Sequence, residues 1–448
     1  MGGSEEERRD QDAGLLQAEV SRPRGAHRLP RARDSSGDRG LHRPQQRGVL
    51  WARDDPPPHS LGCPQSSDAR AGALSFGTGR DGPRHRGFAV GRPALRRSHR
   101  SARVQKARLM SGEPIPNDMD AVVLTAYEGP GSLRVQRRPV PKPGKDEVLV
   151  KVAASPINPS DLAALHGRYG FKPNPPFVPG GEGSGTVVAV GPGPMGRYFE
   201  GSRVACLWDG KRDGAWAQYM VASVKGGVLP LHDSVSLEQG ATSVINPLTA
   251  SAFIEIAKKG DHDAIVLTAA ASSLGRMINR RAPREGVEVI NVVRSGAEEE
   301  LLRKQDASIV LDSTDPDFDE ALRDACHEHD AHLAFDAVAG PMTTRLLRAL
   351  PSGGKVTVYS ALSFEAPQIA PDQLIFEGKS VDGFWLGPFM QSKNLLQLML
   401  MWRRAQRLLP SDLKSDIRAN VPLAEGPSAV EAYVREMTGG KFLLRPNG

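Results

Sequence analysis

The chain has few cysteines and lacks long apolar runs. Only three cysteines occur among its 448 residues, and their spacing forms neither a disulfide framework nor a paired metal motif. This usage is typical of a reduced intracellular protein, so we expect a cytoplasmic location, or the mitochondrial matrix if the source is a eukaryote. No apolar run reaches the roughly 18 residues that a membrane-spanning helix needs. We therefore expect no membrane partner.

Lysine is absent from the first 105 residues, which carry 20 Arg and 12 Asp or Glu. The rest of the chain carries 38 Lys or Arg and 40 Asp or Glu, so it has no basic bias suited to nucleic acid. The arginine-rich part lacks apolar periodicity, and we expect residues 1–118 to be a disordered extension. Its acidic opening argues against an organellar transit peptide. The extension is either a targeting segment or an upstream stretch that is not genuinely coding, with the true start at Met110 or Met119.

Two kinds of pattern divide the remaining chain. Over residues 119–240, short strand-like segments such as EVLVKVAAS lie between Pro and Gly turns, which predicts a mostly β domain. Within it, Ser160 or Asp161 is expected to cap a short helix that Gly167 ends. Over residues 241–385, buried strands such as DAIVLTAA alternate with helices, which predicts a doubly wound parallel sheet. We expect 386–448 to return to the first domain, so the predicted fold class is α/β.

Helical spacing gives the expected helices of the second half. Helical spacing covers 236–259, and further helices are expected after Leu274 and over about 298–304, 319–326, 342–350 and 394–407.

The loop between strand DAIVLTAA and its helix is the candidate cofactor site. Ala270, Ser272 and Gly275 stand where a G-x-G-x-x-G motif has its glycines. Small residues let backbone N–H groups approach a pyrophosphate at a helix N-terminus, although an ordinary strand-to-helix turn has the same pattern. Arg294 ends the next strand, where an acid would suit a ribose 2′-hydroxyl and an arginine suits a 2′-phosphate. Because no carboxylate follows before Glu298, we predict NADPH over NADH; the alternative for Arg294 is a solvated strand-end charge.

Four blocks, NPSDLAALHGRYG, INPLTA, NVVRSG and GFWL, resemble the zinc-independent branch of the medium-chain dehydrogenase/reductase superfamily. The resemblance covers residues 119–448 and is strongest to mitochondrial-type 2-enoyl thioester reductases, with quinone oxidoreductases next. It implies a GroES-like catalytic domain and a Rossmann cofactor domain. Zinc alcohol dehydrogenases carry metal ligands where this chain has Ser160 and Gly181, so the resemblance implies a site without metal. The family's proton donor maps to Tyr169, whose structural alternative is a tyrosine covering the edge of the first domain.

The same resemblance implies a set of cofactor contacts. The family's asparagine near the nicotinamide maps to Asn246, and its pyrophosphate loop is richer in glycine than the loop here. Ser295 follows Arg294, so the grip on a 2′-phosphate is expected to be thinner. The full implied set is Asn246, Thr249, Ala271, Ser272, Ser273, Leu274, Gly275, Arg294, Ser295, Tyr359, Ser360, Ala361, Leu362, Phe384, Trp385, Leu386 and Lys441.

Several of these candidates also have plain structural explanations. Trp385 fits core packing as well as a cleft wall, and Lys441 fits a surface cation as well as a cofactor contact. Glu182 is expected to be a buried hydrogen-bonding group, and His166 is expected to be structural. The ligand-type residues of Cys326-His327-Glu328-His329 crowd adjacent positions, which predicts a solvated helix end rather than a metal site.

These observations predict an NADPH-dependent reductase of 2-enoyl thioesters. A tyrosine with an ordinary pKa near ~10 is protonated at neutral pH and can supply the proton. The alternatives are an NADPH:quinone or alkenal reductase and a non-catalytic NADPH-binding scaffold. The expected partner is a small-molecule acyl thioester or quinone, and a homodimer is implied by the resemblance.

Overall fold

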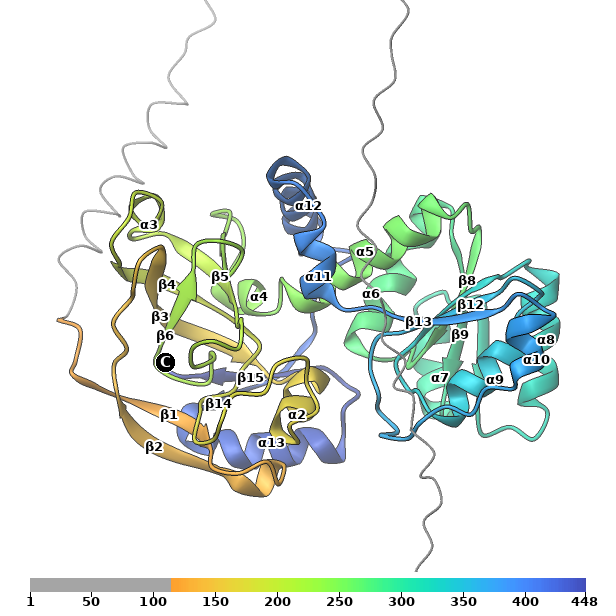
Figure 1. The fold of residues 1–448 in the computed structure, drawn as a ribbon, viewed down its shortest axis with the longest axis horizontal. Coiled ribbons are helices and arrows are strands. Elements are labelled where there is room, and N and C mark those ends of the chain that lie inside the picture. The colour runs from red at the N-terminus through yellow and green to blue at the C-terminus, as the bar shows by residue number, and fades with distance from the viewer. Residues whose placement is uncertain (1–113) are drawn as a thin grey trace, which may run out of the picture. The chain divides into compact units, whose positions relative to one another are not determined.

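The computed structural model describes residues 114–448, which belong to one compact unit (Figure 1). The expectations for residues 1–118 lie almost wholly outside this range. Within it, no helix combines the length and the apolar character needed to cross a membrane.

A mostly antiparallel β region, in which only β14 and β15 pair in parallel, holds the first part of the described chain. One sheet has the order β14-β15-β3-β4-β5-β7, with β6 also paired to β3, and β1 and β2 form a separate antiparallel pair. The strands are β1 (Asp118–Leu124), β2 (Leu133–Pro139), β3 (Glu147–Pro156), β4 (Glu182–Val190), β5 (Arg203–Leu207), β6 (Tyr219–Ser223), β7 (Val228–Pro230), β14 (Ile417–Pro422) and β15 (Lys441–Arg445). β14 and β15 come from the C-terminal end of the chain and pair into this sheet.

The central strand of this region is buried on both sides. In β3, Val148, Val150 and Val152 pack in one apolar cluster, whereas Leu149 packs in another. Successive side chains of a strand point to opposite faces, so the apolar run VLVKV can serve two cores at once.

A six-stranded parallel sheet holds the second part, in the order β10-β9-β8-β11-β12-β13. Its strands are β8 (Ala264–Thr268), β9 (Glu288–Val293), β10 (Ile309–Asp312), β11 (Leu333–Asp336), β12 (Lys355–Val358) and β13 (Ser380–Gly383). Counted from β8, this order is the 3-2-1-4-5-6 of the Rossmann fold, in which ligands bind where the order reverses, here between β8 and β11. The predicted α/β fold class is confirmed.

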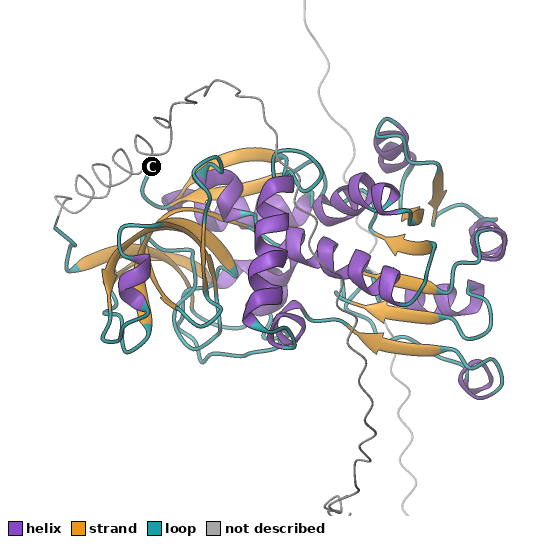
Figure 2. Ribbon diagram, turned by 90° about the horizontal axis from the view of Figure 1, so that it is seen from above, coloured by secondary structure: helices purple, strands orange, loops and turns teal. Residues whose placement is uncertain are grey.

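Helices cover both faces of the parallel sheet, as Figure 2 shows. Neighbouring residues of β8 serve the two faces: Ile265 packs with helices α5 and α6, whereas Val266 packs with α8 and α9. The helices of this half are α5 (Ile245–Lys259), α6 (Ser273–Arg281), α7 (Gly296–Arg303), α8 (Phe318–Glu328), α9 (Pro341–Ala349) and α10 (Pro371–Ile375). The remaining helices are α2 (Pro159–Leu165), α3 (Gly196–Phe199), α4 (Leu237–Ala241), α11 (Leu386–Gln391), α12 (Leu395–Leu408) and α13 (Gly426–Arg435).

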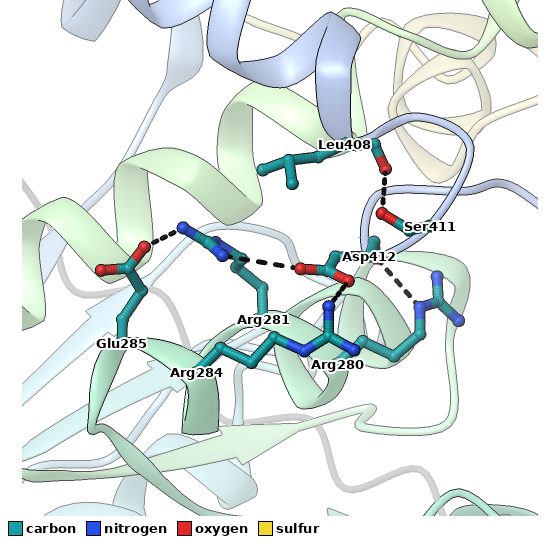
Figure 3. A network of polar contacts seen from close by, with 7 residues as sticks. All are labelled: Arg280, Arg281, Arg284, Glu285, Leu408, Ser411 and Asp412. Atoms are coloured by element: carbon teal, nitrogen blue, oxygen red, sulfur yellow. Dashed lines mark hydrogen bonds and ion pairs between the residues drawn. The ribbon is translucent and has the colours of Figure 1, made fainter.

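An ionic cluster around Asp412 ties the segment after α12 to the end of α6 (Figure 3). The carboxylate, whose side chain is 2% exposed, pairs with Arg284 and lies 3.6 Å from Arg281. Its backbone carbonyl accepts a hydrogen bond of 2.9 Å from Arg280. The segment that leads to β14 is thereby anchored to α6, in the half of the chain that contains the parallel sheet.

The segment 236–259, whose spacing is helical, forms two helices, α4 and α5, because Pro247 lacks an N–H and is tolerated only in a first turn. The predicted cap of α2 was wrong. The cap of α2 is Asn158 rather than Ser160 or Asp161, because Pro159 occupies the first helical position. Asp161 instead accepts the backbone N–H of Asn158 at 2.7 Å.

Candidate functional site

A cavity of about 640 Å³ lies where the parallel sheet reverses its order and meets the β region. Fourteen of the predicted cofactor residues and the predicted proton donor line it together. They are Tyr169, Asn246, Thr249, Ser272, Ser273, Leu274, Arg294, Tyr359, Ser360, Ala361, Leu362, Phe384, Trp385, Leu386 and Lys441. Segments from seven separate parts of the sequence thus meet at one site.

Three predicted residues are placed elsewhere. Ala271 is 1% exposed and packs in the apolar core behind the loop. Gly275 supports the loop, because a Cβ there would lie 2.2 Å from the carbonyl oxygen of Ala270. Ser295 begins α7, where its hydroxyl accepts the backbone N–H of Glu298 at 3.4 Å.

The N-terminus of α6 forms one wall of the cavity. Ser272 caps this helix by accepting the Gly275 N–H at 3.1 Å. The strand-to-helix loop starts at Ala269, whose φ of 49° is left-handed, and Ala269 also lines the cavity. Unpaired N–H groups and the positive end of the helix dipole make such a terminus suited to a phosphate group.

Tyr169 lines the cavity from the β region, within an aromatic group. Its hydroxyl accepts a hydrogen bond of 3.3 Å from Trp385 Nε1, and its ring meets Phe171 edge-to-face at 4.8 Å. Burial raises the pKa of Tyr169, the Trp385 bond lowers it, and the nearby carboxylates of Asp161 and Glu182 raise it. The net shift is upward, so the hydroxyl keeps its proton at neutral pH.

A buried polar cluster underlies this wall. Lys441 donates to the side-chain oxygen of Asn158, whose amide nitrogen donates to Glu182 at 3.1 Å. Glu182 also accepts the backbone N–H groups of Val244 and Ile245 at 3.1 and 3.0 Å. Glu182 is therefore the buried hydrogen-bonding group that we expected, and it fixes the start of α5.

Asp161 completes the cluster by accepting the Gly181 N–H at 2.7 Å. Asn158, Asp161, Glu182 and Lys441 are all at most 2% exposed. Lys441 is thus not a surface cation. It lines the cavity, but its ammonium group is already bound to Asn158 within the buried cluster. The role of Asn158 was not predicted, although the Asn-Pro start of the helix was an available signal.

Burial sets the protonation of this cluster. It raises the pKa of Asp161 to about 7, against the backbone N–H groups of Asn158 and Gly181 and the charge of Lys441. Burial also raises the pKa of Glu182 and lowers that of Lys441. All three groups are therefore less charged in the fold than they would be in water.

Two buried hydroxyls at the cavity lack hydrogen-bond partners among the described residues. They are Ser160 Oγ and Tyr359 Oη, and both residues line the cavity. Buried polar atoms are rarely left unpaired, so these two are available to a bound ligand. The cavity volume also lies within the range of sites for cofactors and drug-sized ligands.

The segment after Tyr359 reaches across to the β region. Phe364 lies 5.2 Å from the Arg168 guanidinium, measured to its ring centroid, and meets the His166 ring at 5.9 Å. Leu362 and Ser363 are held by backbone bonds to Ala337 and Val338. This segment, whose residues 359–363 line the cavity, thus closes one side of it.

No group of three or more His, Cys, Asp or Glu within residues 114–448 is arranged to hold a metal ion. Gly181 offers only backbone groups: its N–H donates to Asp161, and its carbonyl accepts the N–H of Trp208. The ligand-type residues at 326–329 do not form a metal site. Cys326 is wholly buried in the core rather than solvated, and His329 lies 2.8 Å from Glu288. Cys326 corrects the prediction of a solvated helix end for that position, because its side chain faces the sheet.

Comparison with known proteins agrees with this arrangement. Residues 144–233 match the alcohol dehydrogenase GroES-like domain, and residues 273–401 match the zinc-binding dehydrogenase family. A mitochondrial enoyl-acyl-carrier-protein reductase from Caenorhabditis elegans is 31% identical over 55% of this chain and 70% of its own length.

Solved structures are similar along their whole length. A Mesorhizobium loti protein described as an NADPH:quinone reductase has a TM-score of 0.70 at 34% identity, covering 75% of this chain and 100% of its own. A mycobacterial protein solved in complex with NADPH has a TM-score of 0.65 at 25% identity, covering 73% and 100%. The chain therefore belongs to the medium-chain dehydrogenase/reductase family of oxidoreductase enzymes, whose members similar to it include enoyl reductases and quinone reductases.

Proposed function

We propose that this enzyme is an NADPH-dependent reductase of 2-enoyl thioesters that works without zinc. The carrying observation is the cavity that brings the Tyr169 hydroxyl, held by Trp385, together with the α6 N-terminus and Arg294. Relatives named as enoyl reductases and a neighbour solved with NADPH support the substrate and the cofactor.

The residues present fit a dinucleotide. The N-terminus of α6, capped by Ser272, would hold the pyrophosphate, and Arg294 would hold the 2′-phosphate. Asn246 and the unpaired Tyr359 hydroxyl would bind toward the nicotinamide end of the same cavity. When bound, NADPH supplies the hydride that the β carbon of the double bond receives.

The chain supplies the proton. Tyr169 stays protonated because its pKa is raised, and it can transfer its hydrogen to the α carbon next to the thioester carbonyl. Trp385 can only donate, so its bond leaves the tyrosine hydrogen free and stabilises the phenolate that remains. Solvent then returns a proton to the tyrosine. The reacting carbonyl oxygen would be near Ser160, whose hydroxyl has no protein partner in the described range.

A quinone or an alkenal is the second candidate substrate. The solved structure with 34% identity is described as an NADPH:quinone reductase, and reduction of a quinone requires the same hydride and proton. A scaffold that binds NADPH without turnover is the third candidate. Assembly as a homodimer and a cytoplasmic or mitochondrial location stay predictions.

The deciding experiment follows NADPH oxidation by the full chain with crotonyl thioester, quinone and free alkenal in parallel. Turnover of the thioester at least about tenfold faster than of the other acceptors supports the proposal. Turnover of quinone alone replaces the substrate, and tight NADPH binding without any turnover favours the scaffold.

A further inference from the structure

Glu298 folds back onto the arginine that the proposed function assigns to the 2′-phosphate. Its carboxylate lies 3.3 Å from Arg294 Nε and accepts the backbone N–H of Arg294 at 3.2 Å. The Glu298 side chain is 12% exposed, whereas that of Arg294 is 69% exposed. Both residues line the main cavity, so the carboxylate is part of the site.

Apart from Arg294, no unpaired cation beside this site neutralises the negative charge of Glu298 among the described residues. A second hollow of about 470 Å³ adjoins the site at Arg294 and Glu298. Its other charged groups already have partners: Lys304 lies 2.7 Å from Glu300, and Glu436 lies 2.7 Å from Arg418. Arg294 is paired only with Glu298 among residues 114–448.

A carboxylate in this place acts oppositely on the two nicotinamide nucleotides. A 2′-phosphate carries a charge of about −1.5 to −2 near neutral pH, so an adjacent carboxylate repels it and competes for the arginine. A ribose 2′-hydroxyl is a donor that a carboxylate can accept. No acid directly follows β9, where an NAD-binding fold would have one. Glu298, in the first turn of α7, supplies a carboxylate near that position instead.

We infer that Glu298 is a specificity-determining residue that makes the enzyme's preference for NADPH over NADH smaller than Arg294 alone would make it. This inference rests on the proposed nucleotide function of the cavity. Arg294 attracts the phosphate, Glu298 weakens that attraction, and the same carboxylate binds the hydroxyls of the unphosphorylated ribose.

Glu298→Gln tests the inference because glutamine can still accept the Arg294 N–H while losing the charge. Glu299→Gln is the matched control: Glu299 is also in the first turn of α7 and forms an (i, i+4) pair with Arg303 at 2.7 Å. It does not line either hollow. Both substitutions therefore remove the same charge from the same helix end.

Dissociation constants for NADPH and NADH, measured by nucleotide fluorescence on the full chain, give the readout. Glu298→Gln should tighten NADPH about tenfold and weaken NADH several-fold, while Glu299→Gln keeps both near the wild-type values. Arg294→Gln should reduce the effect of Glu298→Gln on NADPH, since the two residues act on the same phosphate.

Equal behaviour of the two glutamine variants overturns the inference, whether both match the wild type or both shift alike. Failure of the proposed function is distinguishable from this result. A wild-type chain that binds neither nucleotide removes the basis of both, whereas binding without turnover of any acceptor removes the reductase and leaves the role of Glu298 intact.

Discussion

Trp385 Nε1 donates a 3.3 Å hydrogen bond to the hydroxyl of Tyr169, although the two residues are 216 positions apart. Their rings also meet edge-to-face, with centroids 6.0 Å apart. This contact joins the end of the parallel sheet to the β region at the edge of the cavity. The hydrogen bond fixes the position of the tyrosine oxygen. Because Trp385 is the donor, the O–H of Tyr169 can still donate to another group.

Tyr169→Phe removes the proposed proton donor with little change in shape. Turnover should fall by about 10²–10⁴-fold, the usual contribution of a positioned acid. NADPH affinity should change by less than about threefold, because the α6 and Arg294 contacts are intact. Stopped-flow turnover and nucleotide titration measure the two quantities, and full activity in the variant would remove Tyr169 from the mechanism.

Trp385→Phe keeps an aromatic ring but loses the donor. The Trp385 bond lowers the pKa of Tyr169, so its loss should raise that pKa further and reduce turnover about five- to tenfold. Trp402→Phe is the control, because Trp402 Nε1 donates to Pro230 at 2.8 Å outside the cavity. An equal loss of turnover in both variants would show that only packing matters.

The buried Asp161 should make stability depend on pH. Its pKa is about 7 in the fold, against about 3.9 for an ordinary aspartate in an unfolded chain. The native state then binds more protons between these values, so the free energy of unfolding should fall as pH rises from about 4 to about 7. The full effect is on the order of a few kcal/mol.

Urea unfolding between pH 4 and 8 measures this slope in the wild type and in Asp161→Asn. The variant should be less stable overall, since an amide group faces two backbone donors, but its profile should be flatter. Asp209→Asn removes an exposed aspartate and should keep the wild-type slope. A steep wild-type-like slope in Asp161→Asn would assign the titration to another group.

Gly275→Ala should disturb the loop that supports the cofactor wall. The added Cβ would meet a backbone oxygen, that of Ala270, at 2.2 Å, so the backbone must move. We expect a loss of about 2 kcal/mol or more in the free energy of unfolding, together with weaker nucleotide binding. Gly296→Ala, at the start of α7 with open space around it, should change stability by less than about 0.5 kcal/mol.

The parallel sheet was predictable because short apolar strands alternate with helices along the sequence, whereas the order of its strands was not predicted. The positions of Tyr169, Trp385 and Arg294 at one cavity followed from the resemblance of short blocks around them. Ala271 was not predictable in the same way. Its place in the core depends on how the loop leaves β8, which composition does not encode.

The buried cluster shows where local pattern fails. Lys441 contacts Asn158 across 283 positions, and Asn158 contacts Glu182 across 24. A lysine near a chain end ordinarily stays in water, since burial of its charge is costly without partners. Only the return of β15 beside β3 brings the partners together.

The main effect of Lys441→Met should therefore be a loss of folding stability rather than a loss of NADPH affinity. It leaves two buried carboxyl groups without their cation, which typically costs about 3–5 kcal/mol. The Lys441 charge lowers the pKa of both Asp161 and Glu182, so its loss should raise both values. Because a raised acid pKa lowers stability as pH increases, the deficit should be larger at pH 8 than at pH 5. Lys379→Met is a matched control, with a side chain only 3% exposed and a 2.7 Å pair to Glu377 away from the cavity. Lys379→Met should lose stability by a similar amount at pH 5 and at pH 8, because it does not change the pKa of Asp161.

A Lys441→Met protein of wild-type stability with much weaker NADPH binding would instead make Lys441 a simple cofactor contact.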